Sequence, residues 1–389
     1  MSPARICLYL LLAIAGAAPA SAAEPDPARC VAPSFSYDAA AALESCAALL
    51  KNDALSDSER ARLLTLRGRS LKVQQQLDAA IDDFEAALAL KPGDVDILLQ
   101  RAWAAFDKRD FDKVGWIVEK VLTADPNNPT AYEIYGSVAF RLKDYPAAKG
   151  FYDRAVALRP DFVHARFNRL VLYKITGAHR AVVEEADALL ALDNPELDTL
   201  YAMLEKKRVT YRTMTRLERA LIFETMGQTE QAERAFADWI AVEPNAVAFG
   251  YRAAFHERHE HYEQALADLD SALADDPTFW LLHHTQGRVY YYTHRDEDAI
   301  RAESRAIALN PDAGVSYWIR AVSERRLKQD DAALQDALKA VAVDRGVLAL
   351  KIETLTKLGY LQIGPNDTKN PVPALAAAVQ ACMLDEECW

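Results

Sequence analysis

The sequence lacks the short motifs on which many enzyme active sites are built. It contains no glycine-rich phosphate loop, no His-Glu-x-x-His metal motif and no nucleophile elbow. It also lacks strand-forming segments from which a sheet could be built. Its many Asp and Glu side chains are expected on solvated helix faces, although composition alone does not exclude a catalytic carboxylate pair. We therefore expect a protein that is not an enzyme and that needs no cofactor.

Long hydrophobic runs are absent after the first residues. Arg5 precedes an apolar run from Ile6 to Ala18, and small residues follow at 20–23. The run is shorter than the ~20 residues that span a bilayer, and the pattern is typical of a bacterial secretory signal peptide. Neither Cys7 nor Cys30 directly follows the small-residue run of a lipid-attachment site. We expect cleavage of residues 1–23, no membrane span and a periplasmic location.

Positive charge is scarce relative to negative charge. The 389 residues include 45 basic and 57 acidic side chains, for a net charge of −12. Loss of Arg5 with the signal peptide makes the mature chain one unit more negative. Such a chain repels phosphate backbones, which argues against nucleic acid as a partner. A composition of 51% apolar and 26% charged residues suits a soluble protein with a large buried core.

Residues 129–162 carry the pattern that organises the chain. They read as two short helices joined by a turn, with small residues that let the helices approach and aromatic residues that fill the seam. A closing proline ends the second helix because proline cannot continue it. The small residues are Gly136, Ala148 and Ala155, the aromatic residues are Tyr132, Tyr145 and Tyr152, and the proline is Pro160. The segment resembles a tetratricopeptide repeat, a helix–turn–helix unit of about 34 residues.

Closing prolines recur along the sequence and set the period. Their spacing is 33–35 residues, interrupted by one spacing of 49, and they are Pro92, Pro126, Pro160, Pro195, Pro244, Pro277 and Pro311. One more step of 34 residues reaches Arg345, where the proline is missing. Eight repeats result, at about 61–94, 95–128, 129–162, 163–196, 213–245, 246–279, 280–313 and 314–346. The resemblance implies an all-α fold, namely a right-handed superhelix (α-solenoid) of about eight helix–turn–helix repeats with helical caps.

The segments outside the repeats suggest caps and one interruption. Residues 24–60 hold a half-repeat cap whose helix is expected at 37–51. Residues 197–212 form an insertion, for which we expect an extra helix at about 195–207. It is either a bulge on a continuous solenoid or a hinge between residues 61–196 and 213–346.

Repeat 4 departs most from the pattern, because Leu170, Val182 and Leu189 stand where small residues are usual. Its two helices are therefore expected to cross further apart.

The tail, residues 347–389, is best interpreted as a helical cap. It also loosely resembles the end of a peptidoglycan-binding-like module. Lys357–Tyr360, Asn366–Asp367 and Ala378–Gln380 carry that resemblance. The Asp-Gly turn and the first third of such a module are missing.

Cysteine is absent between the two ends of the chain. The four cysteines outside the signal peptide are Cys30, Cys46, Cys382 and Cys388, and they allow three pairings. Stacked helices lie ~8–10 Å apart, so many stacked repeats should hold the two ends well apart. We therefore expect the local disulfides Cys30–Cys46 and Cys382–Cys388, since a secreted chain meets an oxidising compartment.

Arginine recurs at the seventh position of the repeats, and an acid often follows sixteen residues later. We expect structural ion pairs within each repeat rather than a phosphate site. The pairs are Arg67–Asp83, Arg169–Glu185, Arg252–Asp268 and Arg320–Asp336.

Histidines gather in repeats 6 and 7. They are His256, His259, His261, His283, His284 and His294. Such a cluster could hold a transition metal, but packed histidines are the better interpretation, and we expect no metal site.

The family resemblance implies a concave groove lined by the first helix of each repeat, at repeat positions 2, 5, 6, 9, 12 and 13. In the first half these positions supply Arg62, Arg69, Lys72, Trp103, Phe106, Phe140, Arg141, Phe167, Asn168 and Lys174. In the second half they supply His284, Arg288, Tyr291, Trp318 and Arg325. The acids Asp96, Asp107 and Glu133 also face the first-half groove, so its charge is mixed. Packing against the next repeat is an equally good interpretation of each aromatic residue.

Two functions fit these features. The first is a periplasmic scaffold that binds protein or peptide partners in its groove, in cell-envelope assembly, secretion or maintenance. The alternative is a cell-wall-associated protein whose tail contacts peptidoglycan while the repeats recruit an envelope enzyme.

Overall fold

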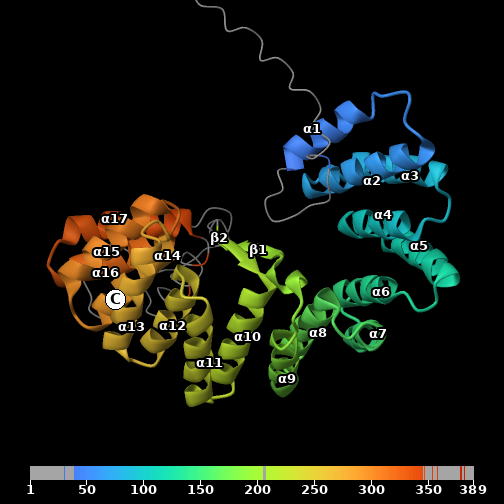
Figure 1. Ribbon diagram of the computed structural model, residues 1–389. Helices are drawn as coiled ribbons and strands as arrows, with labels where there is room; N and C mark the ends of the chain where they lie inside the picture. The colour runs from blue at the N-terminus through green and yellow to red at the C-terminus, as the bar shows by residue number, and fades with distance from the viewer. Residues whose placement is uncertain are drawn as a thin grey trace, which may run out of the picture. The chain divides into compact units, whose positions relative to one another are not determined.

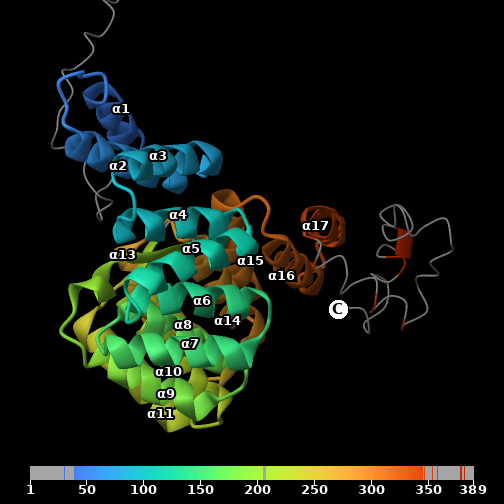
Figure 2. The ribbon, with the colours of Figure 1, turned by 90° about the vertical axis from the view of Figure 1, so that its right-hand side faces the viewer.

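Paired helices make up nearly all of the described part of the chain (Figures 1 and 2). This computed structural model describes Cys30, residues 39–204 and 207–344, and six isolated positions beyond residue 345. It confirms the all-α solenoid expected from the sequence. The chain divides into two units, residues 1–177 with 193–199, and residues 178–192 with 200–389. The division falls within predicted repeat 4 rather than after it.

The first unit begins with α1 (Ala39–Leu49) and continues with helices that follow one another in pairs. They are α2 (Asp57–Val73) and α3 (Leu77–Leu90), α4 (Val95–Asp107) and α5 (Phe111–Ala124), α6 (Pro129–Arg141) and α7 (Tyr145–Leu158), then α8 (Val163–Ile175). The 3-10 helix η1 (Pro195–Asp198) also belongs to this unit. The helices of a pair pack against each other, and the second helix of each pair packs against the first helix of the next.

The second unit has the same pairing. It contains α9 (His179–Leu190), α10 (Tyr211–Thr225) and α11 (Thr229–Val242), α12 (Ala246–Arg258) and α13 (Tyr262–Asp275), α14 (Trp280–Tyr292) and α15 (Asp296–Leu309), and α16 (Gly314–Arg326) and α17 (Asp330–Val343). Six first helices, α4, α6, α8, α12, α14 and α16, begin at residues 95, 129, 163, 246, 280 and 314, the first positions of predicted repeats.

The insertion contains a β-hairpin instead of the extra helix expected at 195–207. Strand β1 (Leu200–Leu204) pairs antiparallel with β2 (Lys207–Thr210), with Leu204 opposite Lys207. The helical prediction was wrong beyond η1 because Tyr201, Val209 and Thr210 are strand formers. Val209 is 2% exposed, and the Thr210 side chain accepts a 3.1 Å hydrogen bond from the Thr213 amide. The end of β2 is therefore fixed to the start of α10.

Helix starts follow local capping chemistry. Asp94 caps α4 by accepting a hydrogen bond from the Ile97 amide at 3.2 Å, and Asn128 caps α6 in the same way. Ser56 and Glu59 form a complete capping box at the start of α2. Each cap satisfies backbone N–H groups that have no partner within the helix, so the short loops end where the sequence places these residues.

The turn between the two helices of every predicted repeat contains one residue with a left-handed backbone. All eight stand at the fifteenth repeat position, with φ between 56° and 72°, and they are Gln75, Arg109, Lys143, Gly177, Gly227, Glu260, His294 and Lys328. In repeat 3 the next residue, Asp144, donates its amide to the Ala139 carbonyl at 2.9 Å. This is the six-residue hydrogen bond that closes a helix end around such a residue.

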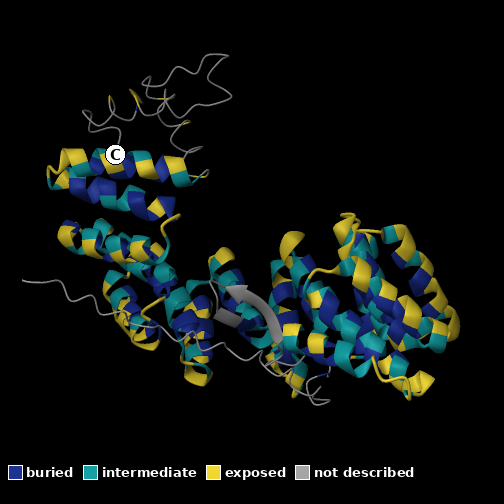
Figure 3. Cartoon of the chain, turned by 90° about the horizontal axis from the view of Figure 1, so that it is seen from above, coloured by how far each residue is buried: buried dark blue, intermediate teal, exposed yellow. Residues whose placement is uncertain are grey.

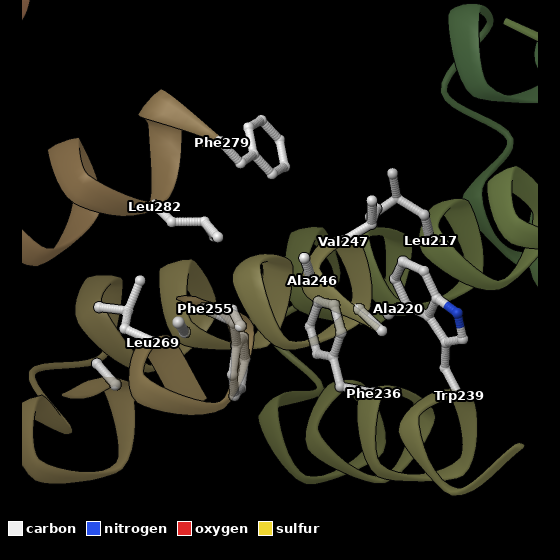
Figure 4. Packing of buried hydrophobic residues seen from close by; sticks show 14 of the residues in the cluster. Leu217, Ala220, Phe236, Trp239, Ala246, Val247, Phe255, Leu269, Phe279 and Leu282 are labelled. Carbon is white, nitrogen blue, oxygen red and sulfur yellow. The ribbon is translucent and has the colours of Figure 1, made fainter. Parts of the chain in front are cut away.

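Small residues at the eighth repeat position allow the paired helices to approach. A Cβ atom at Gly136 would lie 2.5 Å from the Tyr152 ring, and one at Gly68 would lie 2.7 Å from the Phe84 ring. Figure 3 shows the result, with buried residues on the sides of the helices that face neighbouring helices. One cluster of buried hydrophobic residues in the second unit includes Phe236, Trp239, Phe255 and Leu269 (Figure 4).

A disulfide joins helix α1 to Cys30. Cys30 and Cys46 form a disulfide with a Cα–Cα distance of 5.0 Å, which is the pairing expected from the sequence. Both are buried. The signal peptide, the Cys382–Cys388 pair and the peptidoglycan-like tail motifs lie outside the described residues. No helix in the described part of the chain is long and apolar enough to cross a membrane.

Candidate functional site: the groove faces of the first helices

The first helices of neighbouring pairs contact one another as well as their own partners. In the first unit α2 contacts α4, α4 contacts α6 and α6 contacts α8. In the second unit α12 contacts α14 and α14 contacts α16. The side chains at repeat positions 2, 5, 6, 9, 12 and 13 of these helices are called the groove face of each unit below.

Aromatic residues form a partly exposed cluster on the groove face of the first unit. Trp103 meets Phe106 edge-on at 5.4 Å between ring centroids, and the Arg141 guanidinium lies 5.9 Å from the Phe106 ring. Phe140 packs beside Tyr145 at 5.9 Å. Trp103, Phe106 and Phe140 are half-buried. Each ring therefore supports the fold with one part and leaves another part accessible to a partner.

Two residues expected to contact a partner are buried instead. Phe167 is 1% exposed and His284 is 9% exposed. Both stand at the fifth repeat position, as do the buried Leu99 and Glu133. The physical reason is the contact between successive first helices, which covers this position in much of the array. The fifth position was therefore a wrong choice for Phe167 and His284.

Basic residues on the first groove face differ in exposure. Arg62, Arg141 and Lys174 are exposed, whereas Arg69 and Lys72 are half-buried. Burial lowers the pKa of Lys72 and raises the pKa of Asp107, each opposed by the charge of the other. Arg62 lines an open pocket of about 300 Å³ between α2 and α4, together with Asp96.

Glu133 on α6 is a buried acid on this face. It is 4% exposed, and the Asn168 side-chain amide donates to its Oε1 atom at 3.0 Å. Burial raises the pKa of Glu133 to about 8, although the positive charges of Arg159 and Lys72 oppose the shift. The side chain is therefore mostly protonated at pH 7. Glu133 therefore adds less negative charge to this face than an exposed glutamate would.

In the second unit, His284 belongs to a buried hydrogen-bonded group. Its Nδ1 atom lies 3.1 Å from both Glu303 carboxylate oxygens and 3.1 Å from the Ser316 hydroxyl. Glu303 is fully buried, which raises the pKa of its carboxyl. Because the acid and the hydroxyl meet the same ring nitrogen, the group is not arranged as a nucleophile with its base. It joins α14, α15 and α16.

The other predicted residues of the second groove face make contacts within the unit. Arg288 donates to Glu257 Oε1 at 2.8 Å, and the Arg326 guanidinium lies 4.1 Å from the Tyr291 ring. Arg325 donates to Asp330 at 2.9 Å. Trp318 is half-buried.

The sequence analysis missed a pocket between α12 and α14. It has a volume of about 160 Å³ and is lined by Val247, Gly250, Tyr251, Ala254, Phe279, Leu281, Leu282 and Thr285. Six of these stand at repeat positions 2, 5, 6 or 9. The same positional rule includes them, but the predicted groove residues were a selection of aromatic and charged residues that left out Tyr251 as well as the small and aliphatic ones.

The recurring arginines form ion pairs, mostly with the expected acids. Arg67 pairs with Asp83, Arg252 with Asp268 and Arg320 with Asp336. Arg169 pairs with an acid of the preceding repeat, Asp153, at 2.7 Å. Each arginine therefore has a carboxylate beside it.

The histidines of repeat 6 do not converge on a common point. His256 Nε2 lies 3.7 Å from Asp268, and His259 Nε2 lies 3.4 Å from Glu224. Among the described residues, no group of three His, Cys, Asp or Glu side chains is placed to hold a metal ion.

Part of the sequence matches a known protein family. The family model described as Tetratricopeptide repeat matches residues 37–95, 65–113 and 117–161. The matched residues make up less than a third of the chain, and helix pairs continue at the same period beyond them. This partial match supports tetratricopeptide repeats in residues 37–113 and 117–161 and a protein-interaction scaffold.

Individual relatives are distant. The chain is 22% identical over 209 residues to Hsp70-Hsp90 organizing protein 3 of Arabidopsis thaliana, with 54% of this chain and 35% of that protein covered. It is 23% identical over 262 residues to stress-induced-phosphoprotein 1 of Caenorhabditis elegans, with 60% and 80% covered. The chain thus spans about a third of the first relative. A tetratricopeptide repeat protein from Parabacteroides merdae is similar in structure, with 16% identity, a TM-score of 0.45, and 68% and 98% covered.

Proposed function

We propose that this protein binds segments of protein partners on the groove face of its first unit and works in the bacterial cell envelope. The observation that carries the proposal is the half-buried cluster of Trp103, Phe106 and Phe140 beside Arg141. Aromatic and arginine side chains of this kind dominate binding energy at protein interfaces.

The charge of the face suggests the partner's chemistry. Arg62, Arg141 and Lys174 are exposed there, whereas Glu133 carries little charge at pH 7 because burial raises its pKa to about 8. We expect a bound segment with apolar anchor residues and acidic residues between them.

The envelope location rests on two supports. Residues 1–23 have the pattern of a signal peptide. The Cys30–Cys46 disulfide suits an oxidising compartment such as the periplasm. Cell fractionation and the intact mass of the mature protein test this part. A protein that keeps residues 1–23 and stays in the cytoplasm contradicts it.

Peptide-display selection on the full chain, followed by fluorescence anisotropy of the selected peptides, tests the binding surface. The double variant Trp103→Ala with Phe140→Ala should weaken binding at least about tenfold, since buried anchors are each worth ~2 kcal/mol or more. Trp116→Ala is the matched control, because Trp116 is 51% exposed and lies on the second helix α5.

A second variant tests the same surface without removing a packed aromatic ring. Arg141→Glu reverses an exposed charge and should weaken the binding of acidic peptides. The circular dichroism spectrum of the protein should remain unchanged. If both variants fold and bind the selected peptides as tightly as the unmodified chain, the first groove face is not the binding surface.

A further inference from the structure

The turns within the repeats of the first unit carry positive charge, although the chain as a whole is acidic. Repeat positions 12–15 of repeats 1–4 run from the end of the first helix to the left-handed turn residue and are called the turn edge below. They are residues 72–75, 106–109, 140–143 and 174–177, and they include six basic residues and one acid. The loops at positions 31–34, which follow the second helices, include two basic residues and five acids. Positive charge therefore gathers along one edge of the unit.

The turns of neighbouring repeats lie side by side along this edge. Each first helix is followed by a second helix that runs back, so the contacting first helices α2, α4, α6 and α8 end at the same edge. The Arg141 guanidinium at the end of α6 lies 5.9 Å from the Phe106 ring near the end of α4. Burial raises the pKa of Asp107, and the charges of Lys72 and Arg141, one from each neighbouring repeat, oppose the shift. The basic residues therefore form a continuous stripe.

Two acids that directly follow the turn edge are occupied as helix caps. The Asp110 side chain accepts a hydrogen bond from the Lys113 amide at 3.2 Å. The Asp144 side chain accepts one from the Ala147 amide at 3.1 Å. These bonds fix both carboxylates at the starts of α5 and α7, where they satisfy backbone N–H groups of the helix.

Two basic residues of the turn edge occupy strained backbone positions. Arg109 and Lys143 adopt φ values of 62° and 63°, a conformation that glycine reaches without steric cost, as Gly177 does at the same repeat position. Both are exposed, and neither side chain makes an ion pair or hydrogen bond in the described part of the chain. Strained residues of this kind often serve function. Since nothing within the described unit uses these charges, they are available to a binding partner.

Exposed aliphatic side chains stand on the same edge. Four large hydrophobic residues are exposed in the described part of the first unit, and three belong to the turn edge: Val73 at 52%, Leu142 at 61% and Ile175 at 52%. Leucine and valine are under-represented among the anchors of protein interfaces. Apolar side chains beside lysine and arginine are, however, typical of segments that lie on membrane surfaces. The composition of the edge therefore favours a lipid surface over a protein.

We propose that the turn edge of the first unit docks on the surface of an anionic phospholipid bilayer. Val73, Leu142 and Ile175 enter the boundary between headgroups and acyl chains. Arg109 and Lys143 lie against the lipid phosphates. The edge borders the groove face at repeat positions 12 and 13, so a partner segment bound in the groove is held close to the membrane.

Flotation with lipid vesicles tests the docking. The chain from residue 24 onward is used, because the apolar run of residues 6–18 would itself bind lipid. Vesicles made of equal parts phosphatidylcholine and phosphatidylglycerol should capture the protein at least about tenfold better than vesicles of phosphatidylcholine alone. Added salt should release the protein, since it screens the attraction between exposed charges.

A charge variant locates the effect on the turn edge. Arg109→Asn with Lys143→Asn removes both charges, and asparagine tolerates the left-handed backbone. Capture by the anionic vesicles should fall at least about fivefold. The matched control is Lys120→Gln with Arg154→Gln, which removes two exposed charges from the second helices α5 and α7. Its capture should stay within about twofold of the unmodified protein, because these residues lie away from the turn edge.

An apolar variant tests insertion into the bilayer. Leu142→Ser with Ile175→Ser removes two exposed side chains and should weaken capture at least about fivefold, because membrane binding scales with buried apolar area. Trp116→Ser removes the exposed hydrophobic residue that lies outside the edge, and it should leave capture unchanged. Circular dichroism of each variant checks that the helices are retained.

Four outcomes would overturn the proposal. They are equal capture by both kinds of vesicle, unchanged capture of the charge and apolar variants, an equal loss in the control variants, and tight binding of soluble polyglutamate. The last would make an acidic polypeptide the occupant. The charge variant contains no groove-face residue, so it should bind the selected peptides as the unmodified chain does. Failure of membrane docking is therefore distinguishable from failure of the Trp103 and Phe140 test.

Discussion

Asn168 on α8 donates a 3.0 Å hydrogen bond to the Glu133 carboxyl on α6, across 35 residues of sequence. The two residues stand on consecutive first helices of the first unit. The bond provides a polar partner for an acid that the contact between α6 and α8 removes from water.

This acid should make the stability of the first unit depend on pH. The ordinary pKa of a glutamate is 4.5, and burial raises that of folded Glu133 to about 8. Between these values the folded state holds a proton that the unfolded chain has lost, so stability falls as pH rises from about 4.5 to about 8. Glu133→Gln should remove this dependence and raise the free energy of unfolding by ~2 kcal/mol or more at pH 9. Urea unfolding of the unmodified protein and the variant at pH 5 and pH 9 measures this effect. The prediction is contradicted if the two proteins differ in free energy of unfolding by the same amount at both pH values.

Two helical glycines of the first unit should respond oppositely to alanine. At Gly136 the added Cβ would lie 2.5 Å from the buried Tyr152 ring, whereas at Gly150 it would meet no atom within 4 Å. Gly136→Ala should lower the free energy of unfolding by ~1–3 kcal/mol, since the core cannot expand freely. Gly150→Ala should raise it by ~0.5–1 kcal/mol, because alanine restricts the unfolded chain. Urea titrations of the two variants side by side decide the matter, and equal effects would be inconsistent with the packing.

The left-handed turn residue offers a separate test of backbone strain. Lys143 adopts φ 63° and Gly227 adopts φ 71° at equivalent positions of two repeats. Lys143→Gly should stabilise by up to ~1 kcal/mol, because glycine adopts this conformation without steric cost. Gly227→Ala should destabilise by ~1 kcal/mol or more. Thermal melts of both variants show whether each substitution raises or lowers the melting temperature. A higher melting temperature for Gly227→Ala would exclude the left-handed conformation at that turn.

The disulfides can be tested by mapping and by reduction. The Cys30–Cys46 bond joins residues 16 apart, and a loop of this size is worth ~3 kcal/mol in the chain-entropy model. Reduction, or Cys46→Ser, should lower the stability of the α1 end by about that amount and speed proteolysis there. Non-reducing peptide mapping should also find Cys382 linked to Cys388. A Cys46–Cys382 crosslink would rule out the local pairing.

Added metal should leave the protein unchanged. His256 and His259 face the separate acids Asp268 and Glu224. A ligand that binds only the folded state must raise the melting temperature, so melts with zinc, with copper and with a chelator should coincide. A melting temperature that the chelator lowers would show that a bound metal stabilises the fold.

Much of the fold could be predicted because it depends on residues that act locally. Pro92, Pro126 and Pro160 marked the repeat ends, and α4, α6 and α8 begin at the predicted residues. The β-hairpin could not be predicted in the same way. Its segment mixes helix formers with Tyr201, Val209 and Thr210, and the burial of Val209 depends on the surrounding fold.

The site was less predictable, because residue type and repeat position identify a face of a helix but not how deeply a neighbour covers it. Phe167 and Trp318 both stand at the fifth repeat position, yet Phe167 is 1% exposed and Trp318 is half-buried. The pocket beside Gly250 depends on the absence of a side chain. A search for aromatic and charged residues does not register such an absence.

Packing between sequence neighbours has a consequence for how the chain folds. Within each unit, the principal contacts join helices that are adjacent or next but one in sequence. The average loop that must close to form a contact is therefore short and does not lengthen as repeats are added. Folding can begin at any stable helix pair and spread to its neighbours, so the rate of folding should depend on the most stable pair rather than on the length of the chain.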